Sequence, residues 1–280
     1  MILNTANHPY EAIDSSTRGS TAPSAPPRDS SFGTRRVLGI AVIEQRPAAP
    51  AAPAARINCA HCASRDLCLP EALQPKFLAS LPGIFGNSRR VRRGETVHRA
   101  GDTFENIYVS RAGSFKTVAR RSDGQEQITG FHISGEFIGL EGLTSGVHTL
   151  DAIALEDSVV CAIPFRALET LSHEHPELQR HLHRKMSEGI VREASHFMLI
   201  SMSAEERVAA FLANLSQRYR ERGYSPTEFN LRMSREEIGC YLGLKLETVS
   251  RMLSRLRQRG VIEIRGKQTR IVDLAELAHG

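Results

Sequence analysis

The sequence predicts an α+β protein with an N-terminal β jelly-roll domain, a long helix and a C-terminal winged helix-turn-helix domain. Three observations predict this class. Short alternating segments broken by glycines fill residues 75–165, and the periodicity becomes helical after Pro164. A capped pair of short helices follows, together with a basic stretch near the C-terminus. A length of 280 residues suits two domains rather than one.

Composition excludes several classes of protein. With 41% hydrophobic and 24% charged residues, the sequence is ordinary for a soluble globular chain rather than a fibrous or wholly disordered one. It contains no apolar run of the roughly 18–20 residues that span a bilayer, and the N-terminus lacks a signal-peptide pattern. We therefore expect a cytoplasmic protein with no membrane partner.

Residues 1–56 are rich in Pro, Ala, Ser and Thr and offer little that could form a packed core. This segment is expected to be a disordered arm. Its one short apolar patch, Val37 to Ile43, could pair transiently with another segment.

The β domain is expected over residues 75–172. Strands over 106–113, 114–121 and 126–133 are flanked by turn residues, as in an antiparallel sandwich or roll. A proline-free segment then predicts one helix within residues 173–202. Its apolar residues recur every three or four positions: Leu178, Leu182, Met186, Ile190, Ala194, Phe197 and Ile200. The stripe is as narrow as a coiled-coil seam, which favours a homodimer over a helix packed on its own β domain.

The C-terminal domain, residues 203–280, is expected to begin with a helix over 205–221 and a strand near 229–233. Ser234 and Glu237 form a capping box that starts the first helix of a pair, and Gly239 and Gly243 allow the two helices to cross and turn. A second helix over 246–258 exposes side chains that suit base edges and phosphates. These side chains are Glu247, Ser250, Arg251 and Arg255.

Positive charge is concentrated beside this helix pair. Residues 245–270 carry eight Lys or Arg and two Glu, a net charge of +6 that exceeds the +5 of the whole chain. An alternating segment with Arg265 and Lys267 at its turn predicts a two-stranded wing that contacts phosphates. Two plain core helices are the alternative, but the coincidence of cap, glycines and charge favours DNA as the partner.

A cluster of thiols lies between the arm and the β domain, in a loop over residues 57–74. Cys59, Cys62 and Cys68 can hold one face of an iron-sulfur centre, and four thiolates would also suit zinc. A zinc ribbon usually has a second CxxC or a His pair, which is missing here. The fourth ligand is either Cys161 or Cys240, unless it is not a cysteine.

These motifs together resemble the oxygen-sensing branch of the Crp/Fnr family. The resemblance covers about residues 57–275 and rests on the cysteine spacing followed by Leu-Pro and on several separated segments in the same order. These segments are DGQEQITGFH (123–132), VCAIPF (160–165), AEERVAAFLANLS (204–216) and GLKLETVSR (243–251).

The resemblance implies a jelly-roll sensor domain, a dimerisation helix and a [4Fe-4S] cluster on Cys59, Cys62, Cys68 and Cys161. It also implies oxygen as the signal, RNA polymerase as a partner near 123–130, and TTGAT-like half-sites in DNA read by Glu247, Ser250 and Arg251. Lys245 stands where the family often has a capping Ser or Thr, so we expect it to contact phosphate instead.

The helical seam suggests a gate for dimerisation. Glu193 follows Ile190 by about one turn, and in a parallel helix pair the two Glu193 carboxylates would repel each other. We expect a homodimer when the cluster is bound.

Other classes remain open. On the same scaffold the signal could be nitric oxide or a cyclic nucleotide. Gly135-Glu136 resembles the start of a cyclic-nucleotide phosphate cassette, but the following VHTLDAIAL lacks the arginine that would neutralise the phosphate. A zinc-thiolate DNA-binding protein is a further alternative. An enzyme is not expected, because no nucleophile-base pair and no phosphate-binding glycine loop is evident.

Overall fold

The computed structural model describes residues 36–37, 40–41, 55–56, 59, 62, 65–69, 84–85, 87–121 and 123–279. The chain divides into two units, 1–33 and 34–280, and every described residue belongs to the second. Most of the predicted arm, and much of the 57–74 loop, therefore lie outside the described residues.

Part of the predicted arm forms short strands, which corrects the expectation of disorder throughout residues 1–56. Strands β1 (Arg36–Val37) and β2 (Ile40–Ala41) pair with each other. Strand β3 (Ala55–Arg56) pairs with β4 (Asn87–Val91) of the β domain. Backbone groups that join a sheet gain partners regardless of the local composition.

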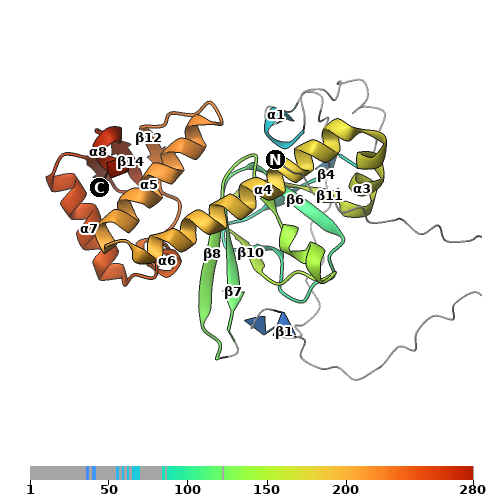
Figure 1. Ribbon diagram of the computed structural model, residues 1–280, viewed down its shortest axis with the longest axis horizontal. Helices are drawn as coiled ribbons and strands as arrows, with labels where there is room; N and C mark the ends of the chain where they lie inside the picture. Colours follow the sequence, from blue (N-terminus) through green and yellow to red (C-terminus); the bar gives the residue numbers. More distant parts are fainter. Residues whose placement is uncertain are drawn as a thin grey trace, which may run out of the picture. The chain divides into compact units, whose positions relative to one another are not determined.

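The β domain is a roll of two antiparallel sheets, here called the β-roll (Figure 1). One sheet has the order β5-β10-β7-β8, and the other has the order β3-β4-β11-β6-β9. The strands are β4 (Asn87–Val91), β5 (Thr96–His98), β6 (Asn106–Ala112), β7 (Phe115–Arg120), β8 (Glu126–His132), β9 (Phe137–Ile138), β10 (Asp151–Ala154) and β11 (Ser158–Pro164). The three strands expected from sequence are β6, β7 and β8.

Side chains at alternate strand positions fill the interior of the β-roll. In β6, Ile107 and Val109 are buried while their neighbours are partly exposed, as expected for strands with one face on a core. Buried side chains from both sheets, among them Phe115, Ile138 and Val160, form a common apolar cluster. A 3-10 turn, η2 (Leu140–Thr144), links β9 to the following loop.

Two helices leave the roll. Helix α3 (Phe165–Glu174) follows β11 directly, and Pro176 begins the long helix α4 (Pro176–Met198), which ends in a 3-10 turn, η3 (Leu199–Ser201). Proline is tolerated at this first helical position, because the N–H it lacks would have no partner in the helix. The helix expected within 173–202 is therefore present, with its start set by the end of α3.

The two halves of α4 differ in environment, and this corrects the prediction of one continuous seam. Leu178 and Leu182 are buried against α3 and the roll in the apolar cluster of their own domain. The second half leaves apolar side chains in solvent, with Ile190 70% and Phe197 71% exposed. The first part of the stripe thus packs within the chain, and the second part has no partner in the portion of the chain that the structure describes.

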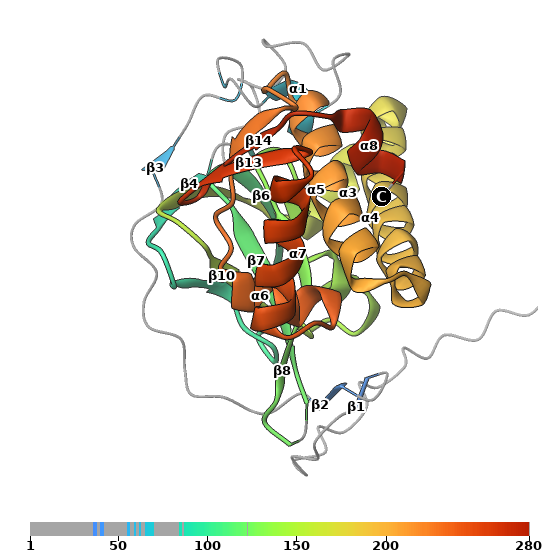
Figure 2. The same ribbon diagram turned by 90° about the vertical axis from the view of Figure 1, so that its left-hand side faces the viewer.

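The C-terminal domain is a winged helix-turn-helix (Figure 2). Its helices are α5 (Ala204–Arg220), α6 (Arg235–Leu242), α7 (Leu246–Gln258) and α8 (Leu274–His279). Its sheet has the order β12-β14-β13, with β12 (Glu228–Asn230), β13 (Ile262–Arg265) and β14 (Gln268–Ile271). No helix among the described residues is long and apolar enough to cross a membrane.

The predicted capping box and turn glycines of this domain are confirmed. The Ser234 hydroxyl accepts from the Glu237 N–H while the Glu237 carboxylate accepts from the Ser234 N–H. Gly243 ends α6 in the left-handed region at φ 65°, and a side chain at Gly239 would meet the Leu244 carbonyl oxygen at 2.5 Å. The same S-x-x-E pattern also caps α5, at Ser203 and Glu206, and the sequence would have supported that prediction too.

Candidate functional site

Four cysteine side chains line one cavity. Cys59, Cys62, Cys68 and Cys161 share it with the apolar side chains of Leu69, Phe85, Val109 and Ile163 and with Arg65 and Arg111. Three of the thiols come from the N-terminal segment over residues 59–68, here called the ligand segment because it is predicted to bind a metal, and the fourth comes from the β-roll. The fold thus brings together residues about 100 positions apart in the chain.

Local structure sets the position of each thiol. The Cys62 N–H donates to the Cys59 carbonyl at 3.3 Å, and the Arg65 N–H donates to the Cys62 carbonyl at 3.0 Å, so the segment coils toward the short helix α1 (Arg65–Cys68). Cys161 lies in the middle of β11, paired with Ser88 of β4 and Val109 of β6. The segment that contains Cys59, Cys62 and Cys68 thereby faces strand β11.

The thiols are held in an environment that disfavours lone thiolates. Burial, followed by repulsion from the neighbouring thiols, raises the pKa of Cys68 to about 12. Burial likewise raises the pKa of Cys161 to about 12, while Arg111 opposes the shift. A metal ion would have to displace these protons on binding.

Cys240, the other candidate for a fourth ligand, lies elsewhere. It belongs to α6, where its thiol accepts from the Ile128 N–H at 3.3 Å and its carbonyl accepts from the Gln127 amide at 2.6 Å. It is not among the residues that line the four-thiol cavity. Cys240 therefore packs α6 against β8.

The donor set fits a cubane iron-sulfur cluster. Such clusters are held by four Cys thiolates, and a dianionic [4Fe-4S] centre with its thiolates would gain from nearby positive charge. Arg65 and Arg111 supply that charge, and the apolar lining limits access of water. Four thiolates would also suit zinc, so the donors alone do not choose between the two metals.

The second predicted site is the exposed face of α7. Glu247 and Arg251 are exposed, and Ser250 is half-buried and accepts from Arg235 at 3.2 Å. Val249, Met252 and Leu256 are buried on the opposite face. The amphipathic pattern therefore presents the three predicted base-reading side chains on one side of the helix.

The basic residues around α7 have different partners. Lys245 precedes α7 with no capping hydrogen bond from its side chain, as expected, and Lys267 is exposed in the wing turn. Arg255 was predicted to face DNA, and it lies 3.7 Å from the Glu205 carboxylate at the start of α5. Arg235 was not predicted, although its position just after the Ser234 cap places it beside the reading helix.

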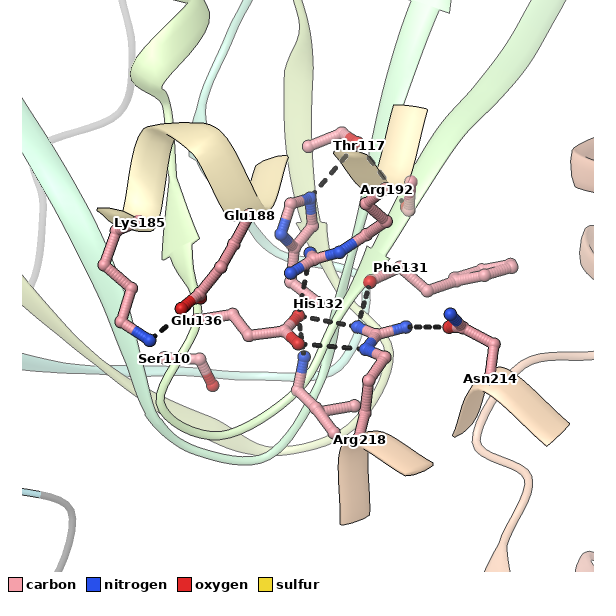
Figure 3. Close-up of polar contacts among 12 residues, drawn as sticks. Ser110, Thr117, Phe131, His132, Glu136, Lys185, Glu188, Arg192, Asn214 and Arg218 are labelled. Atoms are coloured by element: carbon pink, nitrogen blue, oxygen red, sulfur yellow. Dashed lines mark hydrogen bonds and ion pairs between the residues drawn. The ribbon is translucent and has the colours of Figure 1, made fainter. Parts of the chain in front are cut away.

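A buried ionic cluster connects the β-roll to the helices, and sequence reasoning missed it. Glu136, 3% exposed, accepts from Arg218 at 2.6 Å and from Arg192 at 3.2 Å (Figure 3), and also from Arg222 at 2.7 Å. Burial alone would raise its pKa, but the Arg218 and Arg192 guanidiniums hold the pKa of Glu136 well below its usual range. This carboxylate is the one that begins the cassette-like segment, and it is already neutralised within the chain.

Comparison with known proteins identifies the family. Residues 88–175 match the cyclic nucleotide-binding domain model, and residues 206–279 match the Crp-like helix-turn-helix domain model. The chain is 43% identical to the transcriptional activator protein anr of Pseudomonas aeruginosa, over 79% of this chain and 91% of that protein. The chain belongs to the Crp/Fnr family of transcriptional regulators.

Further Crp/Fnr members support this assignment. The fumarate and nitrate reduction regulatory protein of Escherichia coli is 41% identical over 79% of this chain and 90% of its own length. The structure of FixK2 from Bradyrhizobium japonicum superposes with a TM-score of 0.62 at 31% identity, covering 69% of this chain and 95% of that chain. Crp/Fnr regulators bind DNA through the helix-turn-helix and act as dimers, and the curated relatives are transcription factors, not enzymes.

Proposed function

We propose that this Crp/Fnr regulator responds to oxygen through a [4Fe-4S] cluster on Cys59, Cys62, Cys68 and Cys161, and that it dimerises on TTGAT-N4-ATCAA-like sites. One observation carries the proposal: four thiols from two distant segments line one cavity. When bound, such a cluster supplies an oxygen-reactive centre and ties the ligand segment to the β-roll. The genes controlled would be those of anaerobic or microaerobic metabolism.

The route from the thiols to the dimer helix runs through one apolar cluster. Cys59 and Cys68 pack against the buried core that also contains Leu171 of α3 and Leu178 of α4. Cys161 lies on β11, which continues directly into α3. A shift in the position of the ligand segment would therefore alter the packing of the first half of α4. The second half of the same helix carries Ile190 and Glu193, the proposed dimer gate.

Promoter recognition follows from the exposed face of α7. Arg251 can present a bidentate fork to guanine, Glu247 can accept from a cytosine amino group, and Ser250 can contact either edge. Lys245, Arg255 and Lys267 would hold phosphates, with Arg255 leaving its pairing to Glu205. RNA polymerase is the further partner, near residues 123–130 by resemblance to the family.

The test is spectroscopic and uses the fifth cysteine as a matched control. The full chain purified without oxygen should show iron-sulfur absorbance and about four irons per chain, and both should be lost in air. Cys161→Ser should abolish both signals, while Cys240→Ser should retain them. A colourless anaerobic protein that contains one zinc would contradict the proposal in favour of the zinc-thiolate alternative.

Cyclic AMP is expected not to be the effector. Residues 147–155 lack a phosphate-binding arginine, and Glu136 is already bound by three arginines, so an added anion would be buried beside a satisfied carboxylate. Calorimetry on the full chain should detect no binding at micromolar cyclic AMP. A micromolar affinity there would instead support a cyclic-nucleotide sensor.

A further inference from the structure

Inside the β-roll, away from the thiols, three side chains converge from separate segments. His98 ends β5, Glu141 lies in η2, and His148 precedes β10. The nitrogen and oxygen atoms that they can offer to one ion all lie within 4.8 Å of one another. The two imidazole rings stack with centroids 3.7 Å apart, and the Glu141 carboxylate lies 3.1 Å from the His148 Nδ1.

The polar atoms of this group are not satisfied by the rest of the protein. His98 is 3% exposed, and among the described residues neither of its ring nitrogens makes a hydrogen bond of standard geometry. His148 is 1% exposed, and it is surrounded by the rings of Phe104 and Tyr108. A buried polar atom that lacks a good hydrogen bond costs free energy, so a ligand that satisfies it is favoured.

The two imidazoles lie against the backbone at Gly139, where a side chain would collide with them. Gly139 adopts φ +91°, and a Cβ there would lie 2.9 Å from His148 Cε1 and 3.4 Å from His98 Nε2. The buried imidazoles of His98 and His148 can each offer a nitrogen lone pair when they are neutral. Neutral imidazole is the form that binds metals.

We propose that His98, His148 and Glu141 form a binding site for a divalent first-row transition metal ion such as Zn²⁺. Two imidazoles and one carboxylate are a donor set that zinc and iron(II) both accept. Ligands of one zinc at about 2.1 Å lie at most about 4.2 Å apart, so small side-chain movements complete the site. The ion would bind one nitrogen lone pair of each neutral imidazole and the Glu141 carboxylate, and each imidazole would keep its N–H on the other ring nitrogen.

The ion would act on the fold of the sensor domain. It would join β5 and the segment before β10 to η2, which follows β9 of the other sheet. A ligand that binds only the folded state raises stability, by about 2.7 kcal/mol at 100 times its dissociation constant. The site is independent of the thiols, and it occupies the segment where the cyclic-nucleotide cassette would continue.

The experiment must separate this site from the cysteines. The parent protein is the full chain with Cys59→Ser, Cys62→Ser and Cys68→Ser, stripped with a chelator and titrated with Zn²⁺. We expect one equivalent to bind and the melting temperature to rise. With Co²⁺ as the probe, the visible spectrum should show no sulfur charge-transfer band.

Matched variants decide the assignment. Glu141→Gln keeps the size and polarity of a partly exposed side chain and should weaken Zn²⁺ binding at least tenfold, and His98→Gln should abolish it. Glu169→Gln and His173→Gln, on the outer face of α3, should change nothing. The proposal is overturned if the parent binds no Zn²⁺ at micromolar concentration or if Glu141→Gln binds as tightly as the parent. Because Glu141→Gln leaves the core intact, it decides the question even if His98→Gln fails to fold.

Discussion

At the scale of single residues, Glu136 shows how one buried carboxylate can join three parts of a chain. It lies in the β-roll between β8 and β9, while Arg192 lies on α4, Arg218 on α5 and Arg222 in the turn that follows α5. Arg218 also donates to the Phe131 carbonyl at 2.6 Å and Arg222 to the Ser134 carbonyl at 2.6 Å. These additional hydrogen bonds satisfy donors that a single carboxylate could not, so the charges tolerate burial.

Glu136→Gln should destabilise the folded chain by about 3–5 kcal/mol, because it leaves buried guanidiniums without a counter-charge. Glu188→Gln, which breaks an exposed pair with Lys185, should cost about 0–1 kcal/mol. Denaturant unfolding of the two variants measures both values. Equal effects would show that the buried cluster contributes no more than a surface pair.

The same carboxylate predicts a pH dependence. Its pKa is lowered in the folded chain, so its stabilising effect is present above about pH 4.3, the ordinary value for Glu, and is lost as the pH falls toward the folded value. His132, whose pKa burial lowers to about 4, destabilises the fold on acidification in a higher window, between about pH 6.5 and 4. Below about pH 4 the stability of the wild-type chain should therefore fall more steeply than that of Glu136→Gln. Parallel curves would contradict the low pKa.

Two basic residues should affect DNA binding differently. Arg251→Ala should cost about 1–3 kcal/mol and relax the choice at one base pair, because a bidentate contact to guanine is lost. Lys267→Ala should weaken binding to all sequences similarly and reduce the salt dependence, because a phosphate contact is lost. Binding measured on a set of half-site variants at several salt concentrations distinguishes the two. An unchanged base preference in Arg251→Ala would remove its reading role.

At the scale of elements, the turn between α6 and α7 depends on the absence of a side chain at Gly239. A Cβ there would approach the Leu244 carbonyl oxygen to 2.5 Å, and this atom belongs to the backbone and cannot rotate away. Gly189, in α4, has no neighbouring atom within 4 Å of an added Cβ. We expect Gly239→Ala to lower the melting temperature and DNA affinity, and Gly189→Ala to leave stability equal or raise it by up to about 1 kcal/mol. Similar losses in both variants, measured by thermal unfolding of dilute protein, would argue against the close approach.

Elements with strong local signals could be predicted from the sequence. The strands β6, β7 and β8, the helices α4, α5, α6 and α7 and the wing follow from periodicity, caps and glycines that lie within each segment. The division of α4 into a packed and an exposed half could not be predicted from the sequence. Leu178 and Ile190 are both apolar positions of one periodic pattern, and only the folded structure shows that the first is buried and the second exposed. Local pattern gives the face of a helix but not the partner that covers it.

Sites that join distant segments were harder to predict. The sequence alone does not show whether Cys161 or Cys240 lies beside the other three thiols. The answer depends on the position of β11 relative to the ligand segment, which only the folded structure gives. The Glu136 cluster spans separations of 56 to 86 residues, and the group of His98, Glu141 and His148 spans three elements. None of these pairings leaves a periodic signal in the sequence.

At the scale of the whole molecule, the second half of α4 is an apolar surface with no partner among the described residues. Large exposed side chains gather there and in the following η3, namely Ile190, Val191, Phe197 and Met198 of α4 and Ile200 of η3. Contiguous apolar surface of this kind marks an interaction site, which agrees with the dimeric action of Crp/Fnr regulators. Glu193 lies among these residues, and partial loss of water raises its pKa against the opposing effect of His196 and Arg192.

Glu193→Ala should therefore form dimers even in air. In a parallel helix pair the two carboxylates approach the twofold axis, repel each other and resist desolvation, so their removal favours association without any change at the thiols. Glu188→Ala, an exposed carboxylate earlier on the same helix, should remain monomeric in air, and Cys161→Ser should remain monomeric without oxygen. Analytical ultracentrifugation of the three variants under both atmospheres measures this. A monomeric Glu193→Ala in air would show that another residue restrains the dimer, and a dimeric Cys161→Ser without oxygen would show that dimerisation does not require the fourth thiol.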